Sequence, residues 1–452
     1  MKGFKLLFAV LIAIVSCISV RSNAELKVGS AKMDITPDLP CYLGGYYMAG
    51  QAESAHDPLY ARAIVISDGQ NTVALVETDL IMMNGYLSSE IKQEIESKLS
   101  IPSGNVTITS IHTHTGPEGF YEEYGKYPKI VDMNMKKKIE QGIFNAINEA
   151  QKKMAPAEVG TAYIDLTGLT HNRHSDEYPV DSRGFLLLAR NKDGKLIAGL
   201  LNFASHAILA PAQALMISAD WPGVFTATLD KKMNGGVFLF LQGAEGDITP
   251  AGAKGEGWDK VNDYGMQMAS AVASHFSEVK FTSDFPVGGK AVELTLPVRK
   301  QKISAEFRNA IPAKIEAIQK SDLPKQKKDK KIAWLRERAG LESFLQPMFK
   351  TMKRVKNGET KTYAQALKLG DSYVVTFPGE PTAELGMKIR SELAPAKVAV
   401  LGLTNDHLAY MTSQTMFEEG GYEAGMSLIY PDSVDKIIET DLALVKELGQ
   451  GK

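Results

Sequence analysis

The chain has 452 residues, of which 44% are hydrophobic and 23% are charged, close to the averages for soluble globular proteins. This composition excludes a disordered chain, a fibrous repeat and a small disulfide-stapled domain. The charge is nearly balanced, with 51 Lys and Arg against 53 Asp and Glu, so the chain lacks the basic field that binds nucleic acid. Two cysteines cannot build a Cys-ligated zinc site, so His, carboxylate or Tyr must bind any metal.

Residues 1–24 have the composition of a secretory signal peptide. Two lysines precede an apolar run over residues 6–20, and small residues follow it. This run is short for a membrane span, which needs about 20 apolar residues. We expect cleavage near Ala24 and hence a secreted or periplasmic protein. Lipid attachment at Cys17 is a second interpretation and an uncleaved anchor a third, but the apolar run continues past this cysteine.

The rest of the chain alternates strand-like and helix-like stretches. Apolar or alternating runs predict strands at 71–79, 105–110, 185–191, 196–203, 236–242, 291–298, 373–377 and 397–403. Apolar residues at helical spacing predict helices at 88–99, 134–154, 260–279, 382–393 and 431–448. The turn Asp193-Gly194 joins two of the strands in a hairpin, and Asp432 is expected to cap the last helix. The alternation favours a mixed α/β fold, with mixed sheets flanked by helices.

The charged segment 299–352 differs from this pattern. It is predicted to be helical and contains a basic run at 325–331, which is typical of a solvated face or loop. The length of the chain allows two or three domains of about 100–200 residues each. Because no low-complexity linker or internal repeat divides it, we instead expect one large catalytic domain over residues 25–452. Segment 299–352 would then be an insertion in this domain.

The pattern most suggestive of chemistry is the segment 111–117, Ile-His-Thr-His-Thr-Gly-Pro. In a strand, residues i and i+2 lie on the same face, so His112 and His114 are expected to point into one pocket. Histidine is the usual neutral ligand of zinc. On its own, this His-x-His pattern fits a pair of hydrogen-bonded surface histidines about as well as it fits a metal site.

Three further groups follow apolar strands. His206 ends one strand, Glu380 follows another, and the glycine-rich turn 243–250 presents Asp247 and Thr249. Each has an ordinary interpretation: a core histidine, an anion at a helix N-terminus, and a simple turn. In open α/β sheets, however, sites form at the carboxyl ends of the strands. The sequence therefore predicts a metal site of histidine and carboxylate ligands at this edge.

Together, these motifs resemble the catalytic N-terminal domain of the neutral/alkaline, non-lysosomal ceramidase family. The resemblance covers most of the chain in the same order, and 105–117 is its most specific stretch. The segments that carry it are 28–37, 59–63, 77–79, 105–117, 172–173, 202–206, 218–223, 246–250, 378–382, 409–412 and 421–423.

The resemblance implies a secreted, zinc-dependent amidohydrolase that cleaves an N-acyl bond, such as that of ceramide, into an amine and a fatty acid. The four ligands that it implies for one zinc ion are His112, His206, Glu380 and Tyr410. The four catalytic residues that it implies are His114, Arg173, Thr249 and Tyr422. The expected partner is an acyl-amide substrate, either a small molecule or a lipid. A lipid substrate would be encountered at a membrane surface. No nucleic-acid or protein partner is expected.

The chain also departs from the family pattern. Thr249 replaces the family's serine, and segment 299–352 has no counterpart in the family. The C-terminal β-sandwich domain of full-length ceramidases is not expected here. A zinc amidase or esterase for another acylated substrate therefore stays open, as does a non-catalytic binding protein on the same scaffold. The sequence leaves a second site for Ca²⁺ or Mg²⁺ undecided.

Overall fold

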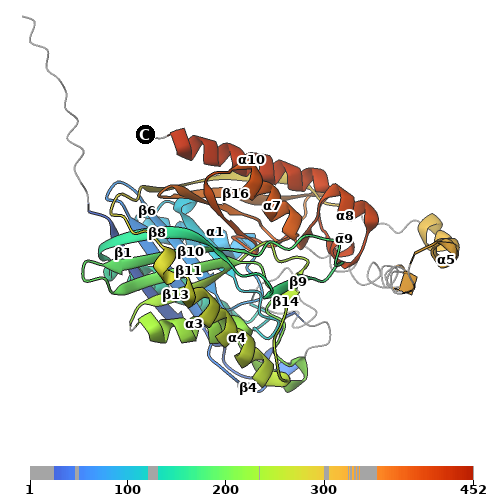
Figure 1. The fold of residues 1–452 in the computed structure, drawn as a ribbon, viewed down its shortest axis with the longest axis horizontal. Helices are drawn as coiled ribbons and strands as arrows, with labels where there is room; N and C mark the ends of the chain where they lie inside the picture. Colours follow the sequence, from blue (N-terminus) through green and yellow to red (C-terminus); the bar gives the residue numbers. More distant parts are fainter. Residues whose placement is uncertain are drawn as a thin grey trace, which may run out of the picture.

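The computed structural model describes residues 25–45, 50–120, 131–233, 235–299, 305–323 and 354–450, with the single residues 325, 328, 329, 332 and 335. The expected signal peptide, with Cys17 and Ala24, lies outside these residues, as does most of the second half of segment 299–352. In the described part of that segment, α5 (Ala305–Lys320) is helical as expected and lies away from the main body (Figure 1). Among the helices described, none is long and apolar enough to cross a membrane.

The largest sheet has eight strands in the order β13-β11-β10-β8-β1-β5-β6-β7. Their bounds are β1 (Lys27–Asp34), β5 (Tyr60–Ser67), β6 (Thr72–Thr78), β7 (Val106–Ser110), β8 (Ala155–Asp165), β10 (Arg183–Asn191), β11 (Leu196–Phe203) and β13 (Val237–Gln242). The central pairs are antiparallel, whereas β6–β7 and β11–β13 are parallel. The parallel pairs lie at the two margins of the sheet. The loops that follow the carboxyl ends of β7, β11 and β13 are therefore placed to form a site.

A second sheet has four strands in the order β15-β16-β17-β19. Their bounds are β15 (Val287–Pro297), β16 (Glu359–Leu369), β17 (Ser372–Thr376) and β19 (Lys397–Leu401). Four small sheets pair β2 (Cys41–Tyr42) with β3 (Gln51–Ala52), β4 (Ser54–Ala55) with β12 (Met216–Ile217), β9 (Thr170–Asn172) with β14 (Ile248–Pro250), and β18 (Glu380–Pro381) with β20 (Tyr410–Met411).

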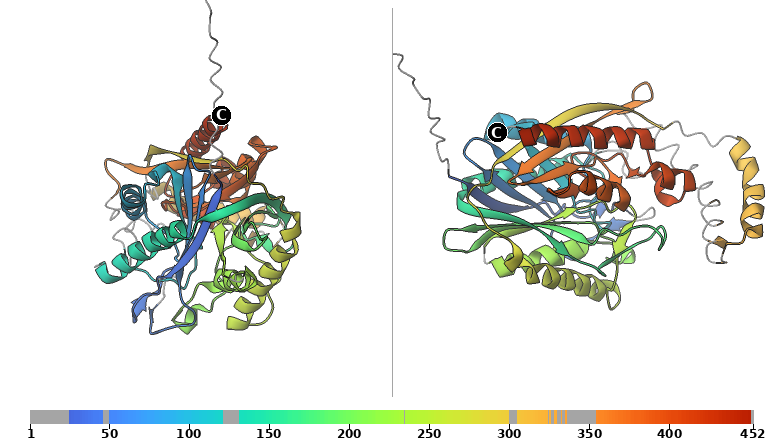
Figure 2. Two further views of the ribbon diagram at one scale, coloured as in Figure 1. Left: turned by 90° about the vertical axis from the view of Figure 1, so that its left-hand side faces the viewer. Right: turned by 45° about the horizontal axis from the view of Figure 1, so that its top comes forward.

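The two large sheets pack face to face between layers of helices. Leu187, Leu200 and Leu239 of the larger sheet share one buried cluster with Val374 and Ala399 of the smaller sheet. The helices are α1 (Gly85–Leu99), α2 (Met133–Lys152), α3 (Asp220–Met233), α4 (Gly257–Ser274), α7 (Ala383–Glu392), α8 (Gln414–Glu419), α9 (Tyr422–Met426) and α10 (Pro431–Gln450). Figures 1 and 2 show α3 and α4 on one side of the sheets and α10 on the opposite side.

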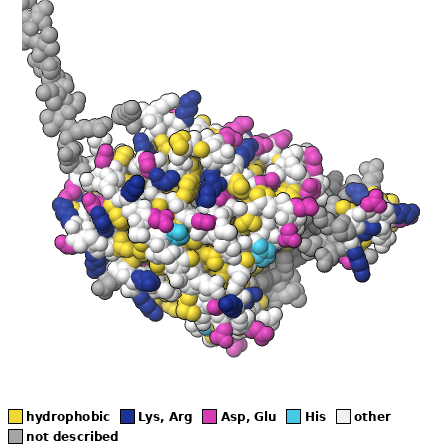
Figure 3. All heavy atoms as spheres, viewed as in Figure 1, with side chains coloured by type: hydrophobic (Ala, Val, Ile, Leu, Met, Phe, Trp, Pro, Cys, Tyr) yellow, Lys and Arg dark blue, Asp and Glu magenta, His cyan; other side chains and the backbone are white. Residues whose placement is uncertain are grey.

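The predicted mixed α/β fold is confirmed, and each predicted strand and helix forms with shifted ends. The cap assigned to Asp432 is wrong, because α10 begins at Pro431 and places Asp432 in its first turn. On the face shown in Figure 3, basic and acidic side chains are intermixed, in keeping with the nearly equal numbers of the two kinds in the chain.

A buried ion cluster joins three strands of the larger sheet. Arg62 is 1% exposed, and its Nη1 lies 3.1 Å from Glu77 Oε1 and 3.0 Å from Asp79 Oδ2. Glu77 Oε2 also accepts the backbone N–H of Phe240 at 2.8 Å, and Asp79 Oδ2 accepts that of Tyr60 at 2.7 Å. The cluster thus ties β5, β6 and β13 together.

Replacing Arg62 with methionine is expected to lower the free energy of unfolding by about 3–5 kcal/mol, because two carboxylates are left buried without their cation. Urea denaturation checks this value. The control is Arg190→Met, which breaks the half-exposed Arg190–Glu158 pair. It is expected to lower the free energy of unfolding by no more than about 1 kcal/mol. Equal losses in the two variants would contradict the prediction.

Candidate metal centre and active site

Two buried histidines hold their Nδ1 atoms against backbone carbonyls. His112 Nδ1 lies 2.8 Å from the carbonyl oxygen of Ile81, and His206 Nδ1 lies 3.0 Å from that of Ile248. A carbonyl only accepts, so Nδ1 carries the proton in both rings and Nε2 keeps a lone pair. Burial, followed by the charge of Arg173, lowers the pKa of His206 to about 4, so this ring is neutral at pH 7. The His206 ring is therefore in the form that binds a metal ion, and the Nδ1 contact of His112 leaves its Nε2 facing the same point.

The carboxylate of Glu380 faces both Nε2 atoms. Its Oε2 lies 3.3 Å from His112 Nε2 and 3.5 Å from His206 Nε2. Within the described residues, neither Glu380 Oε2 nor His206 Nε2 has a hydrogen-bond partner, although both are buried. Lone pairs that face one another at this range repel unless a proton or cation lies between them, so the three atoms fit a shared cation.

Burial raises the pKa of Glu380, but the rings of His112, His206 and His407 outweigh it and hold this pKa well below its ordinary value. The carboxylate is therefore ionised at neutral pH. An anionic oxygen beside two imidazole nitrogens is a donor set that zinc accepts.

His114 joins the same cluster. Its Nε2 lies 3.2 Å from His112 Nε2, and the ligand atoms of His112, His114 and His206 all lie within 4.8 Å of one another. The reason is not the strand alternation expected from sequence, because β7 ends at Ser110 and His112 has a left-handed φ of 67°. A kinked loop after the strand, rather than one strand face, brings the two rings together.

Tyr410 lies beside Glu380 because β18 and β20 run parallel with these two residues in register. Burial, followed by the negative charge of Glu380, raises the pKa of the Tyr410 hydroxyl well above its ordinary value. Arg173 Nη2 donates to this hydroxyl at 3.1 Å. The ring of Tyr422 lies 5.4 Å from that of Tyr410 in an edge-on arrangement. Tyr410 thus lies beside Glu380, and Arg173 and Tyr422, also predicted for the site, contact Tyr410.

Thr249 lies next to the cluster but directs its hydroxyl elsewhere. Its Oγ1 is 3.1 Å from His171 Nε2, its register partner across β9 and β14. The preceding residue, Ile248, supplies the carbonyl that orients His206. Asp247, from the same turn, accepts from Asn172 Nδ2 at 2.6 Å and from a backbone N–H at the start of α7 at 2.8 Å. In this structure, the turn supports the cluster through its backbone.

Sequence reasoning missed two residues of this region. His407 Nε2 lies 3.0 Å from Glu380 Oε1, the carboxylate oxygen that faces away from the other histidines. Glu423 is 2% exposed and accepts from Arg173 Nε at 3.0 Å and from His174 Nδ1 at 3.2 Å. The strand-end rule that selected His206 could have found His407, because it follows β19 along the chain. Glu423 directly follows Tyr422 and had no separate signal.

Comparisons with known proteins point to one family. The family model described as neutral/alkaline non-lysosomal ceramidase, N-terminal, matches residues 26–271, more than half of the chain. Neutral ceramidase A of Dictyostelium discoideum is 28% identical over 53% of this chain, which spans 38% of that relative's length. The neutral ceramidase of Mycobacterium tuberculosis is 22% identical over 94% of this chain and 78% of the relative.

Solved structures show the same fold. The neutral ceramidase from Pseudomonas aeruginosa superposes with a TM-score of 0.72 at 18% identity, covering 93% of this chain and 74% of that one. A structure described as ceramidase complexed with C2 gives the same TM-score and covers 94% of this chain and 76% of that one. From its family match, this chain belongs to the neutral/alkaline non-lysosomal ceramidase family of hydrolases.

Proposed function

We propose that this protein is an exported, zinc-dependent amidohydrolase that hydrolyses an N-acyl bond, with ceramide as its first candidate substrate. The single observation that supports this most is the convergence of His112 Nε2, His206 Nε2 and Glu380 Oε2 on one buried point. Tyr410 beside Glu380 completes the proposed ligand set. Zinc suits these nitrogen and oxygen donors. When bound, it would polarise the scissile carbonyl and lower the pKa of water toward ~7.

The surrounding side chains supply the remaining chemistry. Arg173 keeps its charge at every relevant pH and lies beside Tyr410, where it can donate to the oxyanion that develops on the substrate carbonyl. Burial holds the pKa of His114 well below its ordinary value. The neutral ring can therefore accept a proton from the attacking water and return it to the leaving amine. Tyr422 is a second hydroxyl donor on the same side.

One observation favours a related function. Thr249 replaces the family's serine, and its hydroxyl is engaged with His171. We therefore assign Thr249 an orienting role, and a different acylated amide or ester is the second candidate substrate. A non-catalytic binding protein would bind the acyl compound without releasing a fatty acid.

A hydrolysis screen tests the proposal. Purified protein is incubated with ceramide, short N-acyl amides and acyl esters, and fatty-acid release is compared among wild type, His206→Ala and Thr249→Ala. We expect release from at least one N-acyl amide, its loss in His206→Ala and a milder decrease in Thr249→Ala. Release only from esters would support the second candidate. Release that survives His206→Ala would contradict the proposed chemistry.

His407 is proposed to hold Glu380 in its ligating orientation through the 3.0 Å contact with Oε1. His407→Leu removes this contact and is expected to weaken zinc binding by about 10–100-fold, the usual effect of losing a group that orients a metal ligand. Competition with a chromophoric chelator measures the affinity. His407→Gln can still donate to the carboxylate and is expected to recover part of the loss. Unchanged affinity in His407→Leu would contradict the positioning role.

A further inference from the structure

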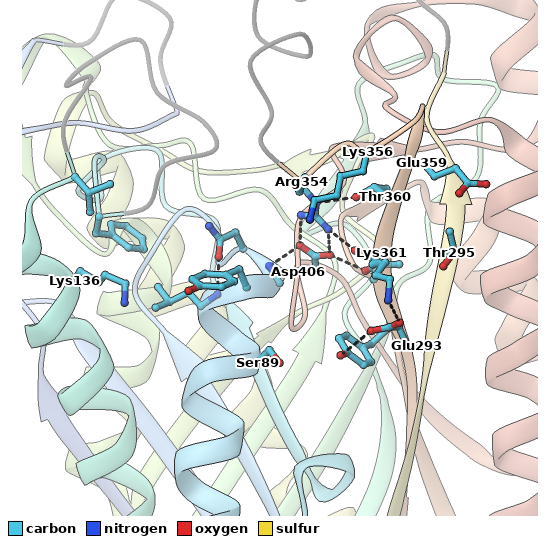
Figure 4. A pocket seen from close by; sticks show the side chains of 18 of the residues that line it. Ser89, Lys136, Glu293, Thr295, Arg354, Lys356, Glu359, Thr360, Lys361 and Asp406 are labelled. Atoms are coloured by element: carbon cyan, nitrogen blue, oxygen red, sulfur yellow. Dashed lines mark hydrogen bonds and ion pairs between the residues drawn. The ribbon is translucent and has the colours of Figure 1, made fainter.

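An arginine–aspartate pair lies one residue away from the metal centre along the chain, yet outside it in space. Arg354 and Asp406 both border a cavity of about 930 Å³, which opens between the N-terminal end of α1 and the β15–β16 pair (Figure 4). None of the clustered histidines lines this cavity. The residue after Asp406 is His407, whose Nε2 lies 3.0 Å from Glu380 Oε1. The loop after β19 therefore connects the pair to a proposed zinc ligand.

The carboxylate of Asp406 ties this loop to the elements on both sides of it. Asp406 is fully buried. Its Oδ1 accepts the backbone N–H of His407 at 2.8 Å and that of Gly85, the first residue of α1, at 2.7 Å. Its Oδ2 accepts the hydroxyl of Thr362, on β16, at 2.7 Å. The loop has left-handed residues at 403, 405 and 409, a backbone that persists only where surrounding contacts hold it. Asp406 supplies such contacts directly before His407.

Arg354 is the cation paired with this carboxylate. Its Nη1 lies 2.7 Å from Asp406 Oδ1 and its Nη2 lies 2.5 Å from Oδ2, so the contact is two-pronged. Nε donates to Thr360 Oγ1 at 2.9 Å and Nη2 to the carbonyl of Lys361 at 2.7 Å, which anchors the guanidinium on β16. Burial raises the pKa of Asp406, but Arg354 and the hydrogen bonds to the carboxylate hold this pKa below its ordinary value. A two-pronged pair has a defined geometry, so it also fixes the oxygen that accepts from His407.

We propose that Arg354 and Asp406 are positioning residues for the metal centre. The pair fixes the backbone at His407, and the His407 ring in turn holds Glu380 in its ligating orientation. This proposal rests on the proposed zinc function and extends it to residues that line a separate cavity. It predicts that a change at Arg354 alters zinc affinity only through His407.

A double-mutant cycle tests the proposal. Zinc affinity of the full chain is measured by competition with a chromophoric chelator, and thermal unfolding is followed in parallel. Arg354→Met is expected to weaken zinc binding by roughly 3–30-fold, the usual range for residues coupled through a chain of contacts. In a His407→Leu background the same change should have little further effect on affinity, because the transmitting ring is gone. Arg354→Lys keeps the charge but loses the two-pronged contact, so its affinity should lie between those of wild type and Arg354→Met.

A second variant acts on the pair from the other side. A Cβ added to Gly85 would lie 2.7 Å from Asp406 Cγ, so Gly85→Ala must displace the carboxylate and should also weaken zinc binding. Its control is Gly288→Ala, where the nearest atom would be 3.8 Å away. The control for the arginine is Arg183→Met, which breaks a two-pronged contact with Asp181 away from the metal centre. Both controls should bind zinc as wild type does.

Three results would overturn the proposal. The first is equal zinc affinity in Arg354→Met, Gly85→Ala and wild type. The second is a loss in Arg354→Met that adds in full to that of His407→Leu, because the pair would then support the fold without acting through His407. The third is a wild type that binds no zinc, which would also refute the proposed function, whereas the first two results leave that function intact.

Discussion

Replacement of His206 by alanine is expected to abolish stoichiometric zinc binding and to lower the rate of amide hydrolysis by about 10³-fold or more. The ring is fully buried, its Nδ1 faces the carbonyl of Ile248, and its Nε2 faces Glu380. Alanine leaves the proposed ion one ligand short. A metal ion contributes several kcal/mol of transition-state stabilisation, and each 1.4 kcal/mol is about a factor of ten in rate. Elemental analysis of the purified chain and steady-state kinetics measure the two effects.

His275→Ala is the matched control. His275 contacts Glu278 at the end of α4 and does not belong to the histidine cluster. It should keep wild-type zinc content and activity. Full zinc content in His206→Ala would refute the assignment of this ligand. A wild type that binds no zinc would refute the metalloenzyme proposal as a whole.

Arg173→Met is expected to lower kcat by about 10²–10³-fold while zinc content stays unchanged, since loss of one oxyanion donor typically has this effect. The guanidinium is fixed from three sides: Nε donates to Glu423, and Nη2 donates to Gly246 O and Tyr410 Oη. These contacts hold the guanidinium next to Tyr410, which lies beside Glu380. Rates at saturating substrate, together with zinc analysis, check the prediction.

Two further variants separate catalysis from folding. Arg183→Met removes a more exposed arginine that pairs with Asp181 and should leave the rate unchanged. Arg173→Lys keeps the charge but loses the two-pronged contact, so its rate should lie between those of wild type and Arg173→Met. Equal rates in Arg173→Met and wild type would refute the role, and loss of zinc in Arg173→Met would assign Arg173 to the support of the metal centre.

Two of the elements that sequence reasoning missed, α3 and β16, share a physical cause. α3 begins with Asp-Trp-Pro-Gly and contains two threonines, residues of modest helix propensity, yet it is helical because it packs against β13 and α4. β16 contains buried Thr360 and Thr362 on one face and buried Gln365 on the other, so neither face appears apolar throughout. Tertiary contacts override weak local preferences at such places.

The sequence by itself predicted many of the main strands and helices, although not β1, β5, β8, β16 or α3. It also placed His112, His206 and Glu380 just after strands. These are local properties, because alternation and helical periodicity depend on neighbouring residues. The near-absence of cysteine likewise limited the metal ligands to His, carboxylate and Tyr.

Only the tertiary structure decided which side chains meet. The contact of Arg173 with Glu423 joins residues 250 positions apart, and that of Glu380 with His407 depends on a loop with left-handed residues at 403, 405 and 409. The cavity of about 930 Å³ likewise needs α1 and the β15–β16 pair to lie side by side. Strand pairing and sheet packing set such long-range contacts, and no short sequence pattern records them.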